Sequence, residues 1–269
     1  MSLEEQILDS FLEITKQSII FVHEWRQDNK DILTKINING QSDVVTLLDY
    51  RIEDNAKNKL NTIFPDFKFV GEESFNRDYN VFKQNYFVMD PIDGTRPFTE
   101  GSSDWSISLC AVIDGEPKVG ILVLPDKSLT ITAIKGLGLK INDTQVDLIN
   151  QTLNSKIGVS PRQIEKVNAT LNKSKFIPNS MSALTTKIGA IISGEIDGAI
   201  YYPEIGKSAS IWDYAAANFL IHEGGGVMKS FTGQNLPYKG IEVIHKDGWI
   251  AAKNSSIFDE IKSCIDIEL

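Results

Sequence analysis

The hexapeptide Asp90-Pro91-Ile92-Asp93-Gly94-Thr95 constrains this chain more than any other segment. It follows the apolar run Tyr86-Phe87-Val88-Met89, which predicts a buried strand. Because Pro91 and Gly94 predict a rigid turn, two carboxylates lie three positions apart where a strand ends. Like charges repel at this spacing, and the pair becomes favourable when a cation lies between them. The alternative interpretation is a polar turn in which one aspartate caps a helix.

Three other segments place acids at the ends of predicted elements. Gly71-Glu72-Glu73-Ser74 follows a predicted strand, although this is also an ordinary loop composition. The segment 43–49 leads into a helical pattern, where Asp49 could face solvent in the first turn, which favours acids. The segment 211–217 opens another predicted helix, and Ser210 and Asp213 also match the spacing of a capping box.

Together, these segments resemble the inositol monophosphatase family of Mg²⁺-dependent, lithium-sensitive phosphomonoesterases. The family pattern is D-x-V-T-x-x-D, G-E-E-S, D-P-I-D-G-T-x-x-F and then W-D before a helix of small residues. All of these motifs occur here in that order, between residues 43 and 226. The resemblance implies an α/β fold, a five-layered αβαβα sandwich with the site between its two halves. It also implies hydrolysis of a small phosphate monoester.

The resemblance assigns metal ligands to the motif residues. Glu72, Asp90 and the backbone carbonyl of Ile92 would bind one Mg²⁺ ion. Asp90, Asp93 and Asp213 would bind a second, giving two or three ions per site. These ligands are hard oxygen atoms, which Mg²⁺ prefers. The ions would neutralise the anionic ester, orient a water molecule and stabilise the leaving oxygen.

Catalytic and substrate-binding roles follow from the same resemblance. Asp49 and Thr95 would orient the attacking water, and Glu72 is counted with them as a catalytic residue. The backbone N–H groups of Gly94 and Thr95 would hold the phosphate at a helix N-terminus. The implied substrate-binding set is Asp93, Gly94, Thr95, Ser182, Ala183, Glu204 and Asp213.

The substrate is less constrained than the reaction. Glu204 lies in a segment that resembles the strand whose glutamate binds the inositol ring, which favours inositol monophosphate or a related sugar phosphate. Arg96 and Lys207 could instead read a second anionic group. The alternatives are therefore a 3′(2′),5′-bisphosphate nucleotidase or a histidinol-phosphate phosphatase of the same superfamily. A non-catalytic, metal-binding regulatory scaffold would be expected to lack a ligand, and none is missing here.

Composition excludes several other classes of protein. A formal net charge of −9 does not suit binding of nucleic acid polymers, which requires a basic face. Two cysteines give no disulfide framework, and the N-terminus lacks the features of a signal peptide. No apolar run approaches the roughly 20 residues that span a bilayer. We expect a cytoplasmic protein that acts on a small phosphorylated metabolite, and the resemblance implies a homodimer.

Turn signals and periodicity divide the chain into two predicted α/β halves, residues 1–150 and 151–269. Asp114-Gly115 and Pro125-Asp126 separate runs that alternate like antiparallel strands. The predicted helices are 3–25, 47–63, 161–170, 181–193, 211–223 and one from about 256. The predicted strands are 67–71, 86–90, 105–113, 119–124, 129–134 and 197–202, with others near 227, 241 and 250.

Overall fold

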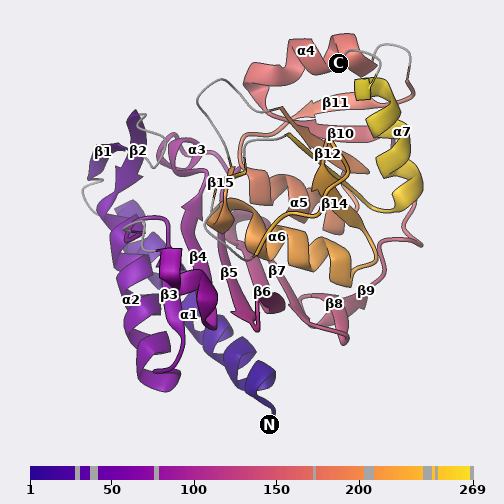
Figure 1. The fold of residues 1–269 in the computed structure, drawn as a ribbon. Coiled ribbons are helices and arrows are strands. Elements are labelled where there is room, and N and C mark those ends of the chain that lie inside the picture. The colour runs from indigo at the N-terminus through magenta and orange to yellow at the C-terminus, as the bar shows by residue number, and fades with distance from the viewer. Residues whose placement is uncertain are drawn as a thin grey trace.

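A seven-stranded sheet forms the centre of the first half of the molecule (Figure 1). The computed structural model describes residues 1–27, 31–36, 42–75, 79–171, 174–202, 209–238, 244–245 and 248–266. The strands, in sheet order, are β3 (Lys68–Gly71), β4 (Tyr86–Asp93), β5 (Ser106–Ile113), β6 (Glu116–Leu124), β7 (Leu129–Ile134), β8 (Gly138–Ile141) and β9 (Thr144–Val146). Only β3 and β4 are parallel neighbours, and the other strands form an antiparallel meander.

The turn between β5 and β6 confirms the prediction of antiparallel strands at this point. Asp114 and Gly115 have φ angles of 54° and 71°, so both residues occupy the left-handed region. Two successive residues of this kind match the right-handed twist of a hairpin, and aspartate followed by glycine adopts them at low cost.

Helices cover both faces of this sheet. Along β4, Phe87 and Met89 pack with α1 (Leu3–Gln27) and α2 (Leu47–Ile63). Tyr86 and Val88 alternate with them and belong to the core on the other face, with α5 (Leu184–Ile192) and α6 (Ile211–Glu223). The alternation follows from the two-residue period of a strand.

A five-stranded sheet forms the centre of the second half. Its order is β11 (Ile177–Ser180), β10 (Lys156–Val159), β12 (Gly198–Tyr201), β16 (Trp249–Ala252) and β14 (Val227–Ser230). Ala199 and Ala251 face the core that contains α5 and α6. Ile200 and Ile250 face the opposite core, which contains α4 (Ile164–Leu171) and α7 (Ser255–Asp266).

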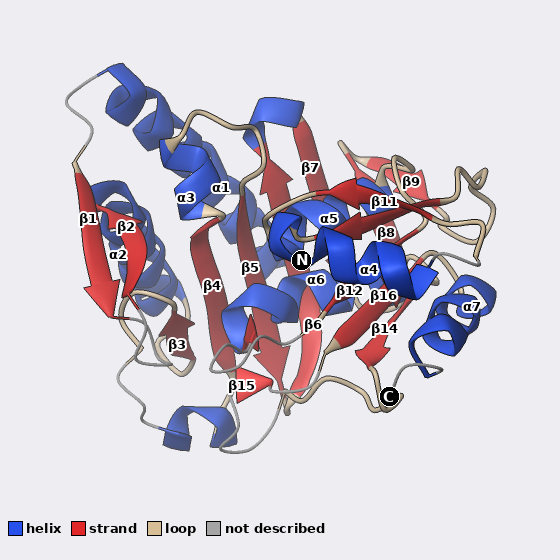
Figure 2. Ribbon diagram, turned by 90° about the horizontal axis from the view of Figure 1, so that it is seen from above, coloured by secondary structure: helices blue, strands red, loops and turns tan. Residues whose placement is uncertain are grey.

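The molecule therefore has the expected five layers, α1/α2, sheet, α5/α6, sheet and α4/α7. Viewed from above, α5 and α6 lie between strands β4 to β7 and strands β12, β14 and β16 (Figure 2). Because both faces of α6 are covered, its residues are apolar nearly all round, and ten of its thirteen are buried. Among the described residues, no helix combines the length and apolar character that crossing a bilayer requires.

The remaining elements are short, and of them only the helix that begins at Thr95 was expected. They are the hairpin of β1 (Ile32–Ile36) and β2 (Ser42–Thr46), the helix α3 (Thr95–Thr99), the two-residue strands β13 (Ala209–Ser210) and β15 (Ile244–His245), and the 3₁₀ turns η1 (Tyr79–Lys83), η2 (Pro125–Lys127) and η3 (Pro161–Gln163). The predicted helix 181–193 was wrong at its start, because residues 181–183 are not helical and Ala183 is the extended N-cap residue of α5. The strand predicted near 241 lies outside the described residues, and the division at residue 150 stays a prediction.

A buried ion pair ties the segment between the two sheets to the second half. Lys253 and Asp197 are at most 1% exposed, and Lys253 Nζ lies 2.9 Å from Asp197 Oδ1. Asp197 Oδ2 accepts hydrogen bonds from the backbone N–H groups of Asn154 and Ser155, at 2.9 and 2.6 Å. Lys253 Nζ also donates to the carbonyl of Thr152, at 3.1 Å. The pair thus anchors the connecting segment through three hydrogen bonds.

We predict that Lys253→Met lowers the free energy of unfolding by about 3–5 kcal/mol, because Asp197 is left as an uncompensated buried charge. Lys118→Met is the matched control. It breaks an exposed pair with Glu116 and should change stability by less than about 1 kcal/mol. Urea unfolding of both variants measures the difference. Equal, small changes would show that the buried pair does not anchor the connecting segment.

Candidate active site

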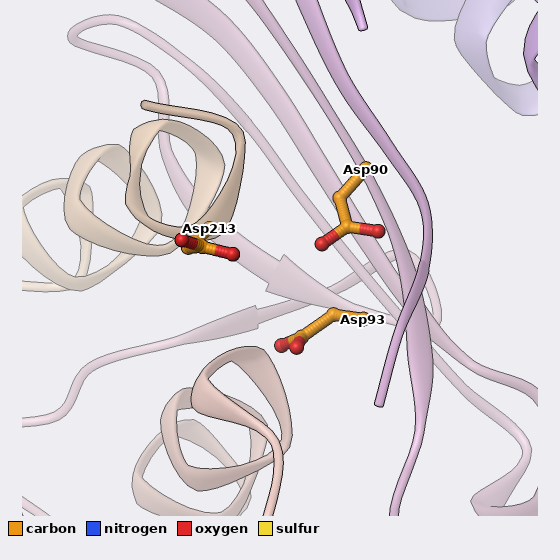
Figure 3. Close-up of side chains that lie close together, drawn as sticks. All are labelled: Asp90, Asp93 and Asp213. Carbon is orange, nitrogen blue, oxygen red and sulfur yellow. The ribbon is translucent and has the colours of Figure 1, made fainter. Parts of the chain in front are cut away.

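The two aspartates of the hexapeptide reach the same side of the sheet because β4 is irregular between them. In a regular strand, residues three positions apart face opposite sides. The pairing of β4 with β5 shifts register between Asp90 and Asp93, so the strand bends there. Figure 3 shows both carboxylates directed toward Asp213. The local break in the pairing of β4 with β5 therefore places both candidate ligands of the motif on one side of the sheet.

Asp213 completes the cluster from the first turn of α6. Carboxylate oxygens of Asp90, Asp93 and Asp213 lie within 4.8 Å of one another. The backbone N–H of Ser210 donates to the Asp213 carboxylate, as a capping box would have it. Asp213 can therefore cap α6 and also belong to the acid cluster, since one carboxylate has several acceptor positions.

The N-terminus of α5 holds Asp93 in place. The backbone N–H of Thr185 donates to Asp93 Oδ2 at 2.7 Å, and the Thr185 hydroxyl donates to the same oxygen. Asp104 receives hydrogen bonds from the backbone N–H of Ser182 and the hydroxyl of Thr186. Two acids of the first half therefore bind the start of one helix of the second half, where unpaired N–H groups and the helix dipole favour negative charge.

At the acid cluster, burial and neighbouring acids outweigh the positive charges of Lys35 and Lys187 and raise the pKa values. Burial and the charges of Glu72, Asp93 and Asp213 raise the pKa of Asp90 well above its ordinary value. Burial and the charge of Asp93 do the same for Asp213. Asp90 Oδ1 is buried and has no hydrogen-bond donor among the residues that the structure describes. An orphaned oxygen among converging carboxylates fits a divalent cation with oxygen ligands.

Glu72 approaches from the neighbouring strand. Because β3 and β4 are parallel and Gly71 pairs with Met89, the residue after β3 arrives beside Asp90. Lys35 of β1 lies 2.8 Å from Glu72 and 2.5 Å from Glu73. Burial lowers the pKa of Lys35, but the two glutamates outweigh this effect and raise it. Sequence reasoning missed Lys35, because a single lysine in a short strand carries no distinctive signal.

Asp49 is fully buried, so the expectation that it could face solvent was wrong. Its Oδ2 accepts hydrogen bonds from the backbone N–H and hydroxyl of Thr46, at 2.8 and 2.6 Å, which caps α2. Its Oδ1 lies 3.3 Å from the hydroxyl of Thr95, which is also 3.0 Å from the Ile92 carbonyl. Burial raises the pKa of Asp49 to about 6, against the hydrogen bonds of Thr46.

Gly94 permits the sharp turn that carries Thr95. Its φ angle is 90°, which favours glycine, and a Cβ atom there would lie 2.6 Å from the Asp104 carbonyl oxygen. Glycine is thus required by both backbone conformation and space.

Most of the motif residues described above line a cavity of about 470 Å³. Its lining residues are Asp43, Val44, Glu72, Asp90, Ile92, Asp93, Gly94, Thr95, Arg96, Pro97, Glu100, Ser160, Pro161, Arg162, Gln163, Ser182, Ala183, Tyr201 and Asp213. Sequence reasoning assigned no role to Asp43 or Arg162, although Asp43 opens one of the motifs. Asp49 lies behind Thr95 rather than in the lining. Glu204 and Lys207 lie outside the described residues.

Comparisons with known proteins agree with this fold. A model described as the inositol monophosphatase family matches residues 7–262. The fructose-1,6-bisphosphatase/inositol-1-monophosphatase of Thermotoga maritima is 26% identical, over 90% of this chain and 91% of that protein. The Nus factor SuhB of Pasteurella multocida is 27% identical, over 78% of this chain and 79% of that protein. A solved structure of an IMPase/NADP phosphatase complexed with Mg²⁺ and phosphate has a TM-score of 0.82 at 19% identity, covering 98% of this chain and 97% of that chain.

We predict that, in EDTA, Asp90→Asn becomes more stable than the wild type as the pH rises above about 4, the ordinary pKa of aspartate. The raised pKa means that folded Asp90 keeps its proton above about pH 4 while the unfolded chain loses it, so wild-type stability falls with pH. The advantage should grow by up to about 1.4 kcal/mol per pH unit. Unfolding curves at several pH values measure it.

The exposed Asp66→Asn is the control, because it removes one carboxylate on the surface and leaves the acid cluster unchanged. Added Mg²⁺ should stabilise the wild type more than Asp90→Asn, because a ligand that binds only the folded state stabilises it. An Asp90→Asn advantage that is constant or shrinks with pH would contradict the assigned repulsion.

Proposed function

The chain belongs to the inositol monophosphatase family, and we propose that it hydrolyses a small phosphate monoester with two or three Mg²⁺ ions bound by Glu72, Asp90, Asp93, Asp213 and the Ile92 carbonyl. Membership of this family makes the chain a phosphomonoester hydrolase. The observation that carries the proposal is the convergence of three carboxylates within 4.8 Å at a cavity wide enough for a small ester.

The donor set fits magnesium. All side-chain ligands are carboxylates, and Asp90 Oδ1 has no other partner within the described ranges. When bound, Mg²⁺ supplies the positive charge that an anionic ester and its leaving oxygen need, and it lowers the pKa of a water molecule. Because the ligands come from β3, β4 and α6, the folded core holds them at fixed separations before any ion arrives.

The positions of Asp49 and Thr95 support the proposal that these two residues orient the attacking water. The Thr95 hydroxyl has one hydrogen, and Asp49 Oδ1 and the Ile92 carbonyl compete for it. Thr95 lines the cavity, so its oxygen can accept a hydrogen bond from water there. With a pKa of about 6, Asp49 is mostly ionised at neutral pH and can take up a proton through Thr95.

The substrate side supports inositol monophosphate or a related sugar phosphate as the leading candidate. Ser182 and Ala183 line the cavity at the start of α5, where the family resemblance places contacts with substrate hydroxyls. Bisphosphate nucleotidase and histidinol-phosphate phosphatase activities are the alternatives. The complete ligand set argues against a non-catalytic scaffold. A cytosolic location and a homodimeric state belong to the same proposal and rest on family membership alone.

We expect phosphate release that requires Mg²⁺ and stops in EDTA. The substrate panel is inositol 1-phosphate, 3′-phosphoadenosine 5′-phosphate, fructose 1,6-bisphosphate, histidinol phosphate and an aryl phosphate. Asp93→Asn should lower kcat at least about a hundredfold, because the ligand loses its charge. Asp259→Asn, on the exposed side of α7, is the matched control and should keep full activity. Turnover in metal-free buffer, or full activity of Asp93→Asn, would refute the site.

Thr95→Ala should keep Mg²⁺ binding, measured by calorimetry, while its kcat falls by roughly tenfold or more. The substitution removes one hydrogen-bonding hydroxyl and no metal ligand, and one such bond contributes about 1 kcal/mol or more. Thr99→Ala, four residues later on α3, is the control, since its hydroxyl bonds only the Arg96 carbonyl among the described contacts. Unchanged kinetics in Thr95→Ala would reduce Thr95 to a structural residue of the turn.

A further inference from the structure

Two arginines line the same cavity as the acid cluster. Arg96 lies on α3, directly after Thr95, and Arg162 lies on η3 in the second half of the molecule. Both residues are exposed. Neither is a metal ligand, and a neutral polyol would not need a second positive region beside the one that the metal ions supply.

These arginines differ from the other arginines that the structure describes. Arg26 binds Asp126 through two hydrogen bonds of 2.8 Å, and Arg51 lies 2.8 Å from a glutamate of α1. Arg96 and Arg162 make no ion pair or hydrogen bond with any described residue. The chain has 36 acidic residues for 27 basic ones, so a lack of carboxylates does not explain this. Of the described arginines, the two without a partner among the described residues are the two at the cavity.

A buried lysine adds positive charge on the side of the cavity that Ser160 and Arg162 line. Lys187 is 1% exposed, and its Nζ donates to the carbonyls of Ser182 and Ala183, at 3.0 and 3.1 Å. It also lies 3.4 Å from the Ser160 hydroxyl oxygen. Burial lowers the pKa of Lys187 to about 8, so the ammonium form still predominates at neutral pH.

Ser160 connects this lysine to the cavity. Because Lys187 donates to the Ser160 oxygen, the Ser160 hydroxyl hydrogen stays available for an acceptor in the cavity that it lines. Ser160 and Arg162 are two positions apart on either side of Pro161, which restricts the backbone between them. The wall therefore presents a hydroxyl donor and a guanidinium group, with an ammonium group behind them.

We propose that the substrate carries a second anionic group, a phosphate or a carboxylate, on the part that leaves as the alcohol, and that Arg162 and Ser160 bind this group. The inference rests on the proposed phosphatase function, and within that function it favours a substrate with two anionic groups over inositol monophosphate. A guanidinium group matches a phosphate or carboxylate with two parallel hydrogen bonds, which a neutral ring cannot provide.

Arg96 has a smaller role than Arg162 in this arrangement. Glu100 follows it by one helical turn and lines the same cavity. A carboxylate there repels an anionic ligand and weakens the attraction of Arg96 for it. No carboxylate is positioned in this way beside Arg162 in the described lining.

The test measures how much a second anionic group on the substrate raises kcat/KM for the wild type and for each variant. One substrate pair is fructose 1,6-bisphosphate and fructose 1-phosphate, and the other is 3-phosphoglycerate and glycerol 3-phosphate. The ratio of kcat/KM within each pair is measured for the wild type, Arg162→Gln, Arg162→Lys, Ser160→Ala and Arg96→Gln. Arg51→Gln, which lies outside the cavity, is the matched control. Thermal unfolding verifies that each variant is folded.

We expect Arg162→Gln to lower the ratio by about ten- to a hundredfold for at least one pair, mainly through KM, because a charge-assisted hydrogen bond is lost. Arg162→Lys should recover part of the loss, and Arg96→Gln should have a smaller effect. The pair that responds identifies the anion as phosphate or carboxylate. A change below about fivefold for both pairs overturns the subsite. If the wild type releases phosphate from none of the panel, the proposed function itself has failed, whereas a hydrolysing wild type with an unchanged ratio refutes the subsite alone.

Discussion

The mutual repulsion of three carboxylates is the constraint around which the molecule is organised. Asp90, Asp93 and Asp213 come from a strand and a helix that are far apart in the sequence, and their oxygens lie within 4.8 Å. Folding brings these charges together in a buried place, which raises the pKa values of all three. The core must therefore supply enough apolar burial to hold them until cations balance the charge.

The same acids also join the two halves of the molecule. Asp93 belongs to the seven-stranded sheet, yet it binds Thr185 at the start of α5, which packs toward the second sheet. Asp213 starts α6, which lies between both sheets. A shift of one half relative to the other would pull ligands apart and break these hydrogen bonds. In the function proposed above, metal binding is coupled to the packing of the two halves through these shared residues.

The parts that could be predicted are those with strong local signals. Asp114-Gly115 predicted a hairpin turn, and the apolar run before Asp90 predicted β4. The hairpin of β1 and β2 was missed because neither strand itself alternates and the Asn39-Gly40 turn signal between them was not used. Ile36 is 70% exposed although it is apolar, so its character says nothing about its environment. The short parallel strands β10 and β11 were missed for a related reason, since their pairing is between distant segments.

The sequence by itself determined which residue types are present and in what order, and this was enough for the family, the layered fold and the candidate ligands. Tertiary structure alone decided how they are used. The irregular end of β4 turns Asp93 to the side of Asp90, against the alternation of a strand. Packing buries Asp49 and leaves Arg162 without a carboxylate partner among the described residues. Facing direction, burial and charge pairing depend on neighbours from distant segments, and no local pattern encodes these neighbours.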